Sequence, residues 1–417
     1  MFSKFEMIFL LLCSLVDAGL CVDCSKNPSD SAKPEHKLRY QLFCKGEYDP
    51  LVRPVKNHED NITVRVFLNL KFFSVDEDSN KFMMHSWVIT KWFDADLTWT
   101  PLEHNGIDQL VVSSSAIWLP DLAIFNSDMS QTMLYSSTDC TVESTGEVKC
   151  APDLQAPVYC DMKLQKWPYD TQKCSLYIST WVNTGNLVDV VIHQKGFRDF
   201  ELMQNGNWEL FNRTAHREAN IGPQNLSYPY LQFDFELRRH AALYSASVIG
   251  PAFALAALMM STFLMKSLAI RCVICCTGLI CDTLFLQYVV WNLPANGDTS
   301  PTIVSFYRDT LILNLAAMAI AIITDQMRSA GDGGCADLCG GQAPKWLVGA
   351  ATFVRGRGGK AGQLILGVQI PQPEEISPRV SEKGGIPQCE TFATFVDRSS
   401  LLALGIVQIF MLITLVP

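Results

Sequence analysis

The sequence lacks the motifs by which many hydrolases and nucleotide-binding proteins are recognised. It contains no H-E-x-x-H zinc motif, no G-x-S-x-G nucleophile turn and no complete phosphate-binding loop. Gly356-x-Gly358-x-x-Ala361 is similar to a dinucleotide fingerprint, but it follows no predicted strand and opens no predicted helix. Cys335 and Cys339 have no second pair of ligands nearby, which disfavours a metal site. The sequence therefore predicts neither an enzyme nor a protein with a cofactor or metal.

Positive charge is also scarce. The 417 residues carry 33 Lys and Arg against 42 Asp and Glu, a formal net charge of −9. Nucleic-acid-binding domains usually present a basic patch, so no nucleic-acid partner is expected. The charges are unevenly spread, because residues 241–265 carry none, whereas the first 240 residues are polar and alternating. A chain of this length is long enough for two domains, and the change near residue 241 predicts where they meet.

The N-terminus has the features of a secretory signal peptide. Lys4 precedes the apolar run Met7–Val16, and Val16-Asp17-Ala18 suits cleavage, so residues 1–18 are predicted to be removed. A short buried helix of a cytosolic domain is the alternative, which the sequons and cysteines that follow disfavour. Three N-x-S/T glycosylation acceptors lie in the polar half, at Asn61, Asn212 and Asn225.

Seven cysteines remain in the polar half after residue 18: Cys21, Cys24, Cys44, Cys140, Cys150, Cys160 and Cys174. An oxidising compartment would pair most of them, and the odd number leaves one thiol over. Cys140 and Cys150 flank Ser144-Thr145-Gly146 symmetrically, as two facing positions of a hairpin would, which predicts a disulfide. The partner of Cys44 stays open between Cys21 and Cys24.

Alternating side chains predict β-strands in this half. Residues 62–73 and 231–238 alternate apolar and polar residues, which is typical of half-buried strands. The residues predicted to point into the core are Ile62, Val64, Val66, Leu68, Leu70, Phe72, Leu231, Phe233, Phe235 and Leu237. Shorter runs lie between them, punctuated by Gly, Asn, Asp or Pro. Residues 19–240 are therefore predicted to be an extracellular antiparallel β-sandwich, with a short helix at residues 35–45.

Four apolar segments are long enough to cross a hydrocarbon core of about 30 Å. They are Ala241–Met265, Cys272–Leu293, Ile303–Thr324 and Leu401–Val416. We assign residues 241–327 to the first three helices, 328–397 to a Gly- and Pro-rich cytoplasmic loop, and 398–417 to the fourth helix. An extracellular N-terminus and four crossings predict an extracellular C-terminus.

A loop motif and several tryptophan motifs connect the chain to a known family. Cys160-x13-Cys174 encloses Trp167, Pro168, Tyr169 and Asp170. Further matches are Tyr48-Asp-Pro-Leu-Val-Arg-Pro-Val55, Trp87-x4-Trp92-x-Asp94-x-x-Leu97-x-Trp99, Trp118-Leu-Pro-Asp121, Leu237-Arg-Arg239 and Val396-Asp-Arg398. In these motifs the sequence resembles the Cys-loop pentameric ligand-gated ion channels, and in particular nicotinic acetylcholine receptor subunits of the non-α type.

The resemblance implies a fold and a coupling element. The family fold is an immunoglobulin-like, all-β extracellular sandwich of about ten strands on a four-helix transmembrane domain, assembled as a ring of five. A disulfide between Cys160 and Cys174 would close the signature loop, and closing a loop of this length stabilises a fold by roughly 3 kcal/mol. Trp167, Pro168 and Tyr169 would press on the linker near Ala295–Ser300 and couple ligand binding to gating.

The resemblance also implies a ligand pocket for a small cationic neurotransmitter such as acetylcholine. Trp181, Phe125 and Tyr228 match aromatic positions of the principal face, and Trp87 matches the tryptophan that the neighbouring subunit contributes. Aromatic rings attract an ammonium group by about 0.5–2 kcal/mol each. Pro223 and Gln224 replace the vicinal cysteine pair of α subunits, and Ile221 replaces a capping-loop tyrosine.

The second span aligns with the pore helix of the family. Arg271, Val273, Thr277, Ile280 and Leu284 would line the pore, with Ile280 as the central apolar gate. Ala269-Ile270-Arg271 replaces the Gly-Glu-Lys of cation-selective members, whose carboxylates select cations. Asp282 lies in mid-span, where a carboxylate needs a partner or water.

Three functions are consistent with these matches. The first is a plasma-membrane, postsynaptic cation-channel subunit that is gated by an acetylcholine-like amine and assembled with homologous subunits within membrane lipid. The second is an auxiliary or anion-conducting subunit, which the missing carboxylate near Arg271 suggests. The third is a membrane-tethered ligand-binding protein that does not conduct.

Overall fold

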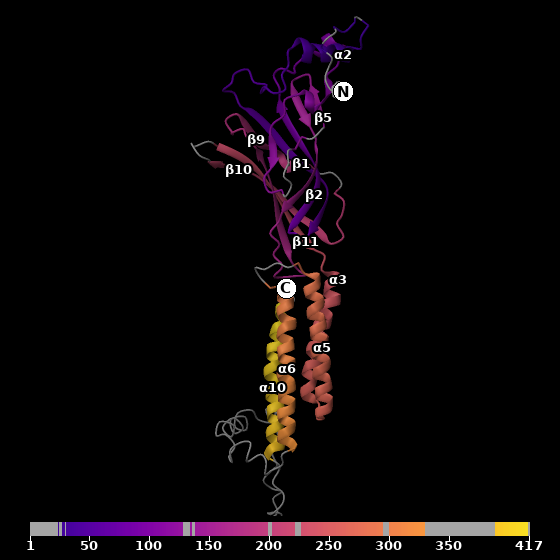
Figure 1. The fold of residues 1–417 in the computed structure, drawn as a ribbon, viewed down its shortest axis with the longest axis vertical. Coiled ribbons are helices and arrows are strands. Elements are labelled where there is room, and N and C mark those ends of the chain that lie inside the picture. Colours follow the sequence, from indigo (N-terminus) through magenta and orange to yellow (C-terminus); the bar gives the residue numbers. More distant parts are fainter. Residues whose placement is uncertain are drawn as a thin grey trace, which may run out of the picture. The chain divides into compact units, whose positions relative to one another are not determined.

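The computed structural model describes residues 24, 27–29, 31–127, 134–135, 138–198, 202–221, 227–294, 300–329 and 388–415, without the side chains of 220–221 and 388–392. The expectations for residues 1–18, for Cys21, Pro223, Gln224 and Asn225, and for most of 328–397 fall outside these residues. The chain divides into two compact units (Figure 1). One comprises Met1–Met162 and Thr171–Arg239, and the other comprises Lys163–Asp170 and His240–Pro417.

The first unit is a sandwich of two sheets. A seven-stranded sheet has the order β3-β5-β6-β2-β1-β9 with β7 also paired to β2, and a four-stranded sheet has the order β10-β11-β8-β4. The strands are β1 Ile62–Asp76, β2 Lys81–Phe93, β3 Gln109–Ser113, β4 Leu122–Ile124, β5 Asp139–Glu143, β6 Glu147–Cys150, β7 Asp153–Tyr159, β8 Thr171–Thr180, β9 Val188–Phe197, β10 Trp208–Ile221 and β11 Ser227–Arg239. The predicted all-β sandwich is confirmed.

Side chains from both sheets fill the core between them. The rings of Phe82 on β2 and Phe235 on β11 lie 5.2 Å apart, and Phe197 on β9 lies 5.6 Å from Phe233 on β11. The inward alternation predicted for residues 231–238 is confirmed, because all four apolar members are fully buried. Aromatic pairs at these distances add about 0.5–1.5 kcal/mol each to the burial of their surface.

The alternation predicted for β1 holds only as far as Leu70. The β1–β2 register shifts between Leu70 and Phe72, so two β1 residues stand opposite His85. After this β-bulge Phe72 is partly exposed, and Phe73 takes the inward position. The prediction that Phe72 points into the core is therefore wrong, because an inserted residue reverses the faces of the strand beyond it.

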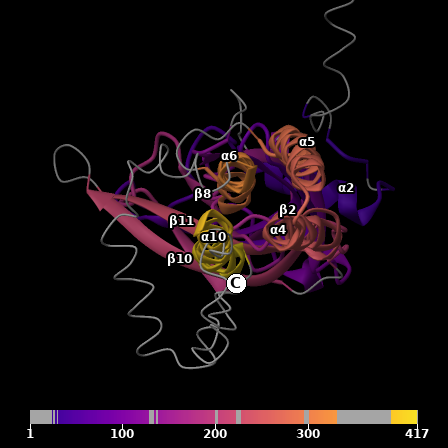
Figure 2. The same cartoon turned by 90° about the horizontal axis from the view of Figure 1, so that it is seen from below.

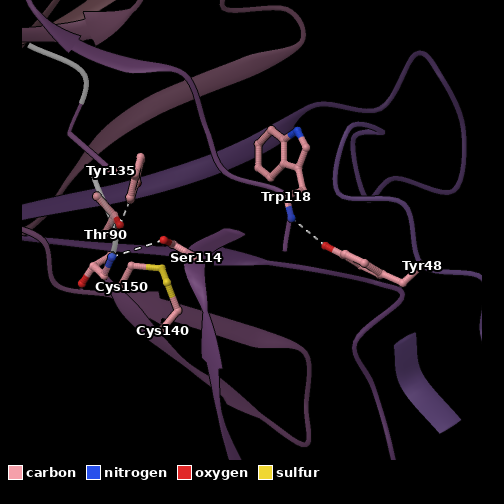
Figure 3. Close-up of a disulfide and its surroundings, with 8 residues drawn as sticks. Tyr48, Thr90, Ser114, Trp118, Tyr135, Cys140 and Cys150 are labelled. Atoms are coloured by element: carbon pink, nitrogen blue, oxygen red, sulfur yellow. Dashed lines mark hydrogen bonds between the residues drawn. A yellow bond between two sulfur atoms is a disulfide. The ribbon is translucent and has the colours of Figure 1, made fainter. Parts of the chain in front are cut away.

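Short elements and disulfides complete the first unit. The helix predicted at residues 35–45 consists of α2 Pro34–Arg39 and the π-helical turn Tyr40–Lys45. Cys24 is the partner of Cys44, and a second disulfide joins Cys140 and Cys150 across the β5–β6 hairpin (Figure 3). The 3-10 turns Pro101–His104 and Ser114–Ala116 connect strands.

The helices of the second unit include four segments long and apolar enough to span a membrane within the described residues. They are Ala242–Leu264 (α3 Ala242–Tyr244, a π-helical turn Ser245–Ile249, α4 Gly250–Ser261 and a 3-10 turn Thr262–Leu264), α5 Leu268–Asn292, α6 Thr302–Ser329 and, within α10 Gln388–Leu415, Ala393–Leu415. Seen end-on in Figure 2, α4, α5, α6 and α10 form one bundle. The last helix begins at Gln388, so it extends into the predicted cytoplasmic loop 328–397.

Candidate functional site

An exposed aromatic pair lies at the ends of two neighbouring strands. Phe125 follows β4 and Trp181 follows β8, and their ring centroids are 5.7 Å apart. Phe125 is 52% exposed and Trp181 is 62% exposed, so both rings present open faces. Two large exposed aromatic side chains that touch one another make this pair a candidate binding surface.

Asp121 fixes the segment that carries Trp181. The backbone N–H of Trp181 donates to the Asp121 carbonyl at 2.9 Å. The Asp121 carboxylate accepts hydrogen bonds from the Val182 N–H at 2.6 Å and from the Asn183 side-chain amide at 2.7 Å. Because Asp121 directly precedes β4, these bonds hold the Trp181 segment beside the strand that leads to Phe125.

A second group of aromatic side chains lies on the same sheet. Tyr177 on β8 and Tyr230 on β11 have ring centroids 6.0 Å apart, and the Tyr230 hydroxyl donates to the Glu218 carboxylate, which raises the pKa of Tyr230. Tyr228 is partly exposed at the start of β11, opposite Asn220. Within the described residues its ring contacts neither Phe125 nor Trp181. The sequence interpretation missed Tyr230, although it lies two residues from Tyr228 on the same face of the strand.

Trp87 lies on the other sheet and is not brought to this pair. On β2 it stands opposite Asn69 of β1 and Asp153 of β7. The ammonium of Lys71 lies 4.0 Å from the centroid of the Trp87 ring, and it also pairs with the Asp153 carboxylate at 2.5 Å. The two candidate ligand faces therefore belong to different sheets.

The loop between Cys160 and Cys174 has its tip in the helical unit. The structure forms the disulfide, and the tip residues Lys163–Asp170 group with the helices. The ring of Trp167 lies 4.9 Å from that of Tyr244, and the Tyr169 hydroxyl is 2.9 Å from the Ser245 hydroxyl. The Trp167–Pro168 peptide bond is cis, and Asp170 is buried.

A third contact joins the tip to the start of α6. The backbone N–H and the hydroxyl of Thr302 both donate to the Gln165 carbonyl, at 3.0 and 2.9 Å. The predicted contact was with the linker 295–300, of which residues 295–299 lie outside the described part. The observed contacts are with the starts of the first and third helical segments.

A buried hydrogen-bond network supports the segment that leads to Phe125. The Tyr48 hydroxyl donates to the Asp94 carboxylate at 2.7 Å. It also accepts a hydrogen bond from the Trp118 backbone N–H at 2.9 Å (Figure 3). Burial raises the pKa of Asp94 to about 6 and raises that of Tyr48 well above its usual range. Trp99 and Trp118 are both buried in the sandwich, so these tryptophans are structural.

Four of the five predicted pore-lining residues share one face of α5. Val273, Thr277, Ile280 and Leu284 are all exposed and are spaced four, three and four residues apart, which places them along one stripe of a helix. The Thr277 hydroxyl donates to the Val273 carbonyl at 2.8 Å, so this polar side chain bonds to its own helix. The stripe is apolar apart from Thr277.

Arg271 does not share this face, contrary to the prediction. It is fully buried, donates to the Asp397 carboxylate of α10 at 2.8 Å and donates to the Thr324 hydroxyl of α6 at 2.9 Å. Arg328 also pairs with Asp397 at 2.5 Å. A buried guanidinium needs a counter-charge, and Asp397 of the Val396-Asp-Arg398 motif supplies it inside the bundle.

Asp282 is also turned into the bundle, away from the stripe. It is fully buried, and its carboxylate accepts a hydrogen bond from the Asn314 amide of α6 at 2.5 Å. This bond supplies the partner expected for a carboxylate in mid-span. Cys275 packs with Met259, Phe263 and Ala317 in the apolar core of the bundle, in keeping with a small apolar role.

Two of the three predicted glycosylation acceptors can be located. Asn61 precedes β1 and Asn212 lies on β10, and both side chains are exposed. The Asn212 amide donates to the Glu236 carboxylate at 3.2 Å. Both sites are accessible from solvent, and Asn225 lies outside the described residues.

Comparison with known proteins places these features in context. Residues 35–241 match the family described as the neurotransmitter-gated ion-channel ligand binding domain. Over 297 residues the chain is 26% identical to neuronal acetylcholine receptor subunit alpha-5 of Homo sapiens, covering 71% of this chain and 63% of the relative. Over 306 residues it is 28% identical to subunit beta-3 of Rattus norvegicus, covering 72% and 65%. The chain thus matches less than two thirds of the length of these relatives.

Proposed function

We propose that this chain is a member of the family of neurotransmitter-gated ion channels that includes the nicotinic acetylcholine receptor subunits, and that it acts as one subunit of such a channel. The observation that carries the proposal is the tip of the Cys160–Cys174 loop. Its residues Trp167 and Tyr169 contact Tyr244 and Ser245, in the same unit as the α5 stripe. In a channel subunit, these contacts would pass a movement of the loop to the helical segments.

The ligand of the proposed channel is a small organic ammonium ion such as acetylcholine. The exposed rings of Phe125 and Trp181 would form the principal face. Tyr228 would join them; it lies two residues before Tyr230, whose ring is paired with that of Tyr177. Trp87 would serve the opposite face, towards a neighbouring subunit. Each ring attracts an ammonium by about 0.5–2 kcal/mol, so three rings together contribute at most about 6 kcal/mol, which suffices for millimolar but not for micromolar binding.

The pore would be formed by α5 from homologous subunits in a ring of five. The stripe of Val273, Thr277, Ile280 and Leu284 would face the ion path, and Ile280 would close it by excluding water. Arg271 would instead hold α5 against α10 through its ion pair with Asp397. The similarity to acetylcholine receptor subunits does not favour an auxiliary, anion-conducting or purely ligand-binding role.

The chain is a multi-pass membrane protein of the plasma membrane in this proposal. Its polar half and its C-terminus would face the outside, its apolar helices would contact lipid, and a postsynaptic site would suit its ligand. No residue is assigned a catalytic role.

The proposal is tested by recording membrane current from cells that express the chain alone and together with an α-type nicotinic subunit. Acetylcholine is expected to evoke current in at least one combination. Trp181→Leu in the responding combination should raise the half-maximal concentration about tenfold, because one cation–π contact is lost. Val182→Ala, a change at the exposed neighbouring residue, should leave it unchanged. The absence of evoked current in every combination would reject the channel function.

A further inference from the structure

Lys71 owes its position to the β-bulge in β1. In a regular ladder it would stand opposite His85, because Leu70 stands opposite Ser86. The bulge gives that place to Phe72, whose ring stacks on His85 with centroids 3.9 Å apart. Bulges commonly redirect side chains in this way. The Lys71 side chain instead reaches Trp87, one position along the outer face of β2.

Two further contacts hold Lys71 there. The Asp153 carboxylate, on the strand on the other side of Trp87, pairs with the Lys71 ammonium at 2.5 Å. The Lys71 carbonyl accepts the backbone N–H of Met203 at 2.9 Å. The Lys71 side chain is 25% exposed. An ammonium 4.0 Å from the ring centroid lies within the range at which a cation occupies an aromatic face.

We propose that Lys71 is a built-in ammonium group that occupies the Trp87 ring and thereby determines whether this face of the subunit accepts an external organic ammonium. The role of Trp87 as a ligand-facing ring rests on the proposed function. An external amine competes with a cation that is tethered next to the ring, and a tether gives the attached group a high effective concentration. The external amine gains the Trp87 ring only when the Lys71 ammonium leaves the ring for solvent.

The proposal predicts that removing the Lys71 charge opens the Trp87 face. In Lys71→Met the side chain keeps most of its apolar length over the ring but loses the ammonium. Asp153→Asn keeps the ammonium and weakens its anchor, so its effect should be intermediate. Lys91 offers a matched control. Its ammonium pairs with the Glu147 carboxylate at the same 2.5 Å, but among the described residues it lies over no aromatic ring.

The experiment uses the full-length chain in lipid nanodiscs with 5-fluorotryptophan incorporated and tetramethylammonium as the probe. The Trp87 fluorine resonance is assigned by its loss in Trp87→Phe. In Lys71→Met this resonance should shift saturably, with an apparent Kd about tenfold or more below that of the wild type. Asp153→Asn should fall between them, and Lys91→Met should match the wild type.

Three results would overturn the proposal: equal apparent Kd values in the wild type and Lys71→Met, no titration of Trp87 in either protein, or an equal gain in Lys91→Met. The last would attribute the effect to net charge alone. Since the readout needs no current, a silent channel with a positive fluorine result would reject only the channel function. Evoked currents without a Lys71 effect would reject only the role of Lys71.

Discussion

Asp94 holds its carboxyl group in a fully buried site beside Tyr48. Burial raises its pKa to about 6, above the 3.8 of an unperturbed carboxyl group. The folded state therefore binds this proton more tightly than the unfolded state. The resulting contribution to the free energy of unfolding is fully present below about pH 4. That stability is lost as the pH rises to about 6, a loss of about 3 kcal/mol for this group.

Asp94→Asn should remove this pH dependence. The apparent melting temperature of the full chain in detergent, compared with wild type between pH 4 and pH 7, should show a smaller decline with rising pH. Asp234 is the opposite control: although burial alone would raise its pKa, hydrogen bonds from Gln232, Ser175 and Lys173 lower it. Its contribution is present above about pH 4 and lost in acid. Parallel pH curves for wild type and Asp94→Asn would contradict the assignment.

Asp397 should be the most sensitive residue of the helix bundle. Asp397→Asn leaves the buried Arg271 without a counter-charge, which costs about 3–5 kcal/mol when a buried pair is broken. Arg271→Met should cost less, because Asp397 keeps Arg328 as a partner. Melting temperatures of the two variants in detergent measure the order. A smaller loss in Asp397→Asn than in Arg271→Met would contradict this account of the network.

Some site residues could be predicted from the sequence, and others could not. The motifs around Trp181 and Phe125 were sufficient to name both rings, and the structure brings them together. Arg271 was assigned to the pore because alignment with the family's pore helix gives a position on a helix but does not reveal a counter-charge in a distant segment. Its partner Asp397 lies 126 residues further along the chain. Lys71 had no motif of its own, because its position depends on a bulge.

At the scale of the element, the strand patterns were informative and their irregularities were not. The alternation of residues 231–238 predicts β11 correctly, because both sheets bury one face of each strand. The bulge after Leu70 cannot be recognised in the sequence Leu70-Lys-Phe-Phe73, because either of the two phenylalanines could point inward. The start of α10 at Gln388 was missed because the polar first turns of that helix resemble the loop before it.

The tip of the Cys160–Cys174 loop should act as a coupling element through a small number of contacts. Tyr169→Phe removes the hydroxyl that lies 2.9 Å from Ser245. A hydrogen bond contributes about 1 kcal/mol, so the half-maximal agonist concentration should rise about fivefold without a change in ligand binding. Ser245→Ala should give the same shift, and the double variant should be no worse than either single variant. Additive shifts would show that the two hydroxyls act independently.

At the scale of the molecule, a β-sandwich precedes helices of which four, among the described residues, are long and apolar enough to cross a membrane. The alternating segments predicted the β-sandwich, and the long apolar segments predicted the helices. They could not predict which side of each helix faces its neighbours, because that depends on buried polar pairs such as Asp282 with Asn314. With these pairs turned inward, α5 presents a mostly apolar stripe to its surroundings, as a pore helix in a ring of subunits would.

The most direct test of the central claim compares two isoleucines, Ile280 on the α5 stripe and Ile312 on α6, which are 61% and 56% exposed. Each is changed to Thr, and acetylcholine-evoked current is recorded in the responding combination of subunits. A polar side chain in an apolar constriction favours wetting, so Ile280→Thr should lower the half-maximal concentration or produce current without agonist. Ile312→Thr should behave as wild type. Unchanged gating in Ile280→Thr, or an equal effect of Ile312→Thr, would contradict a pore lined by α5.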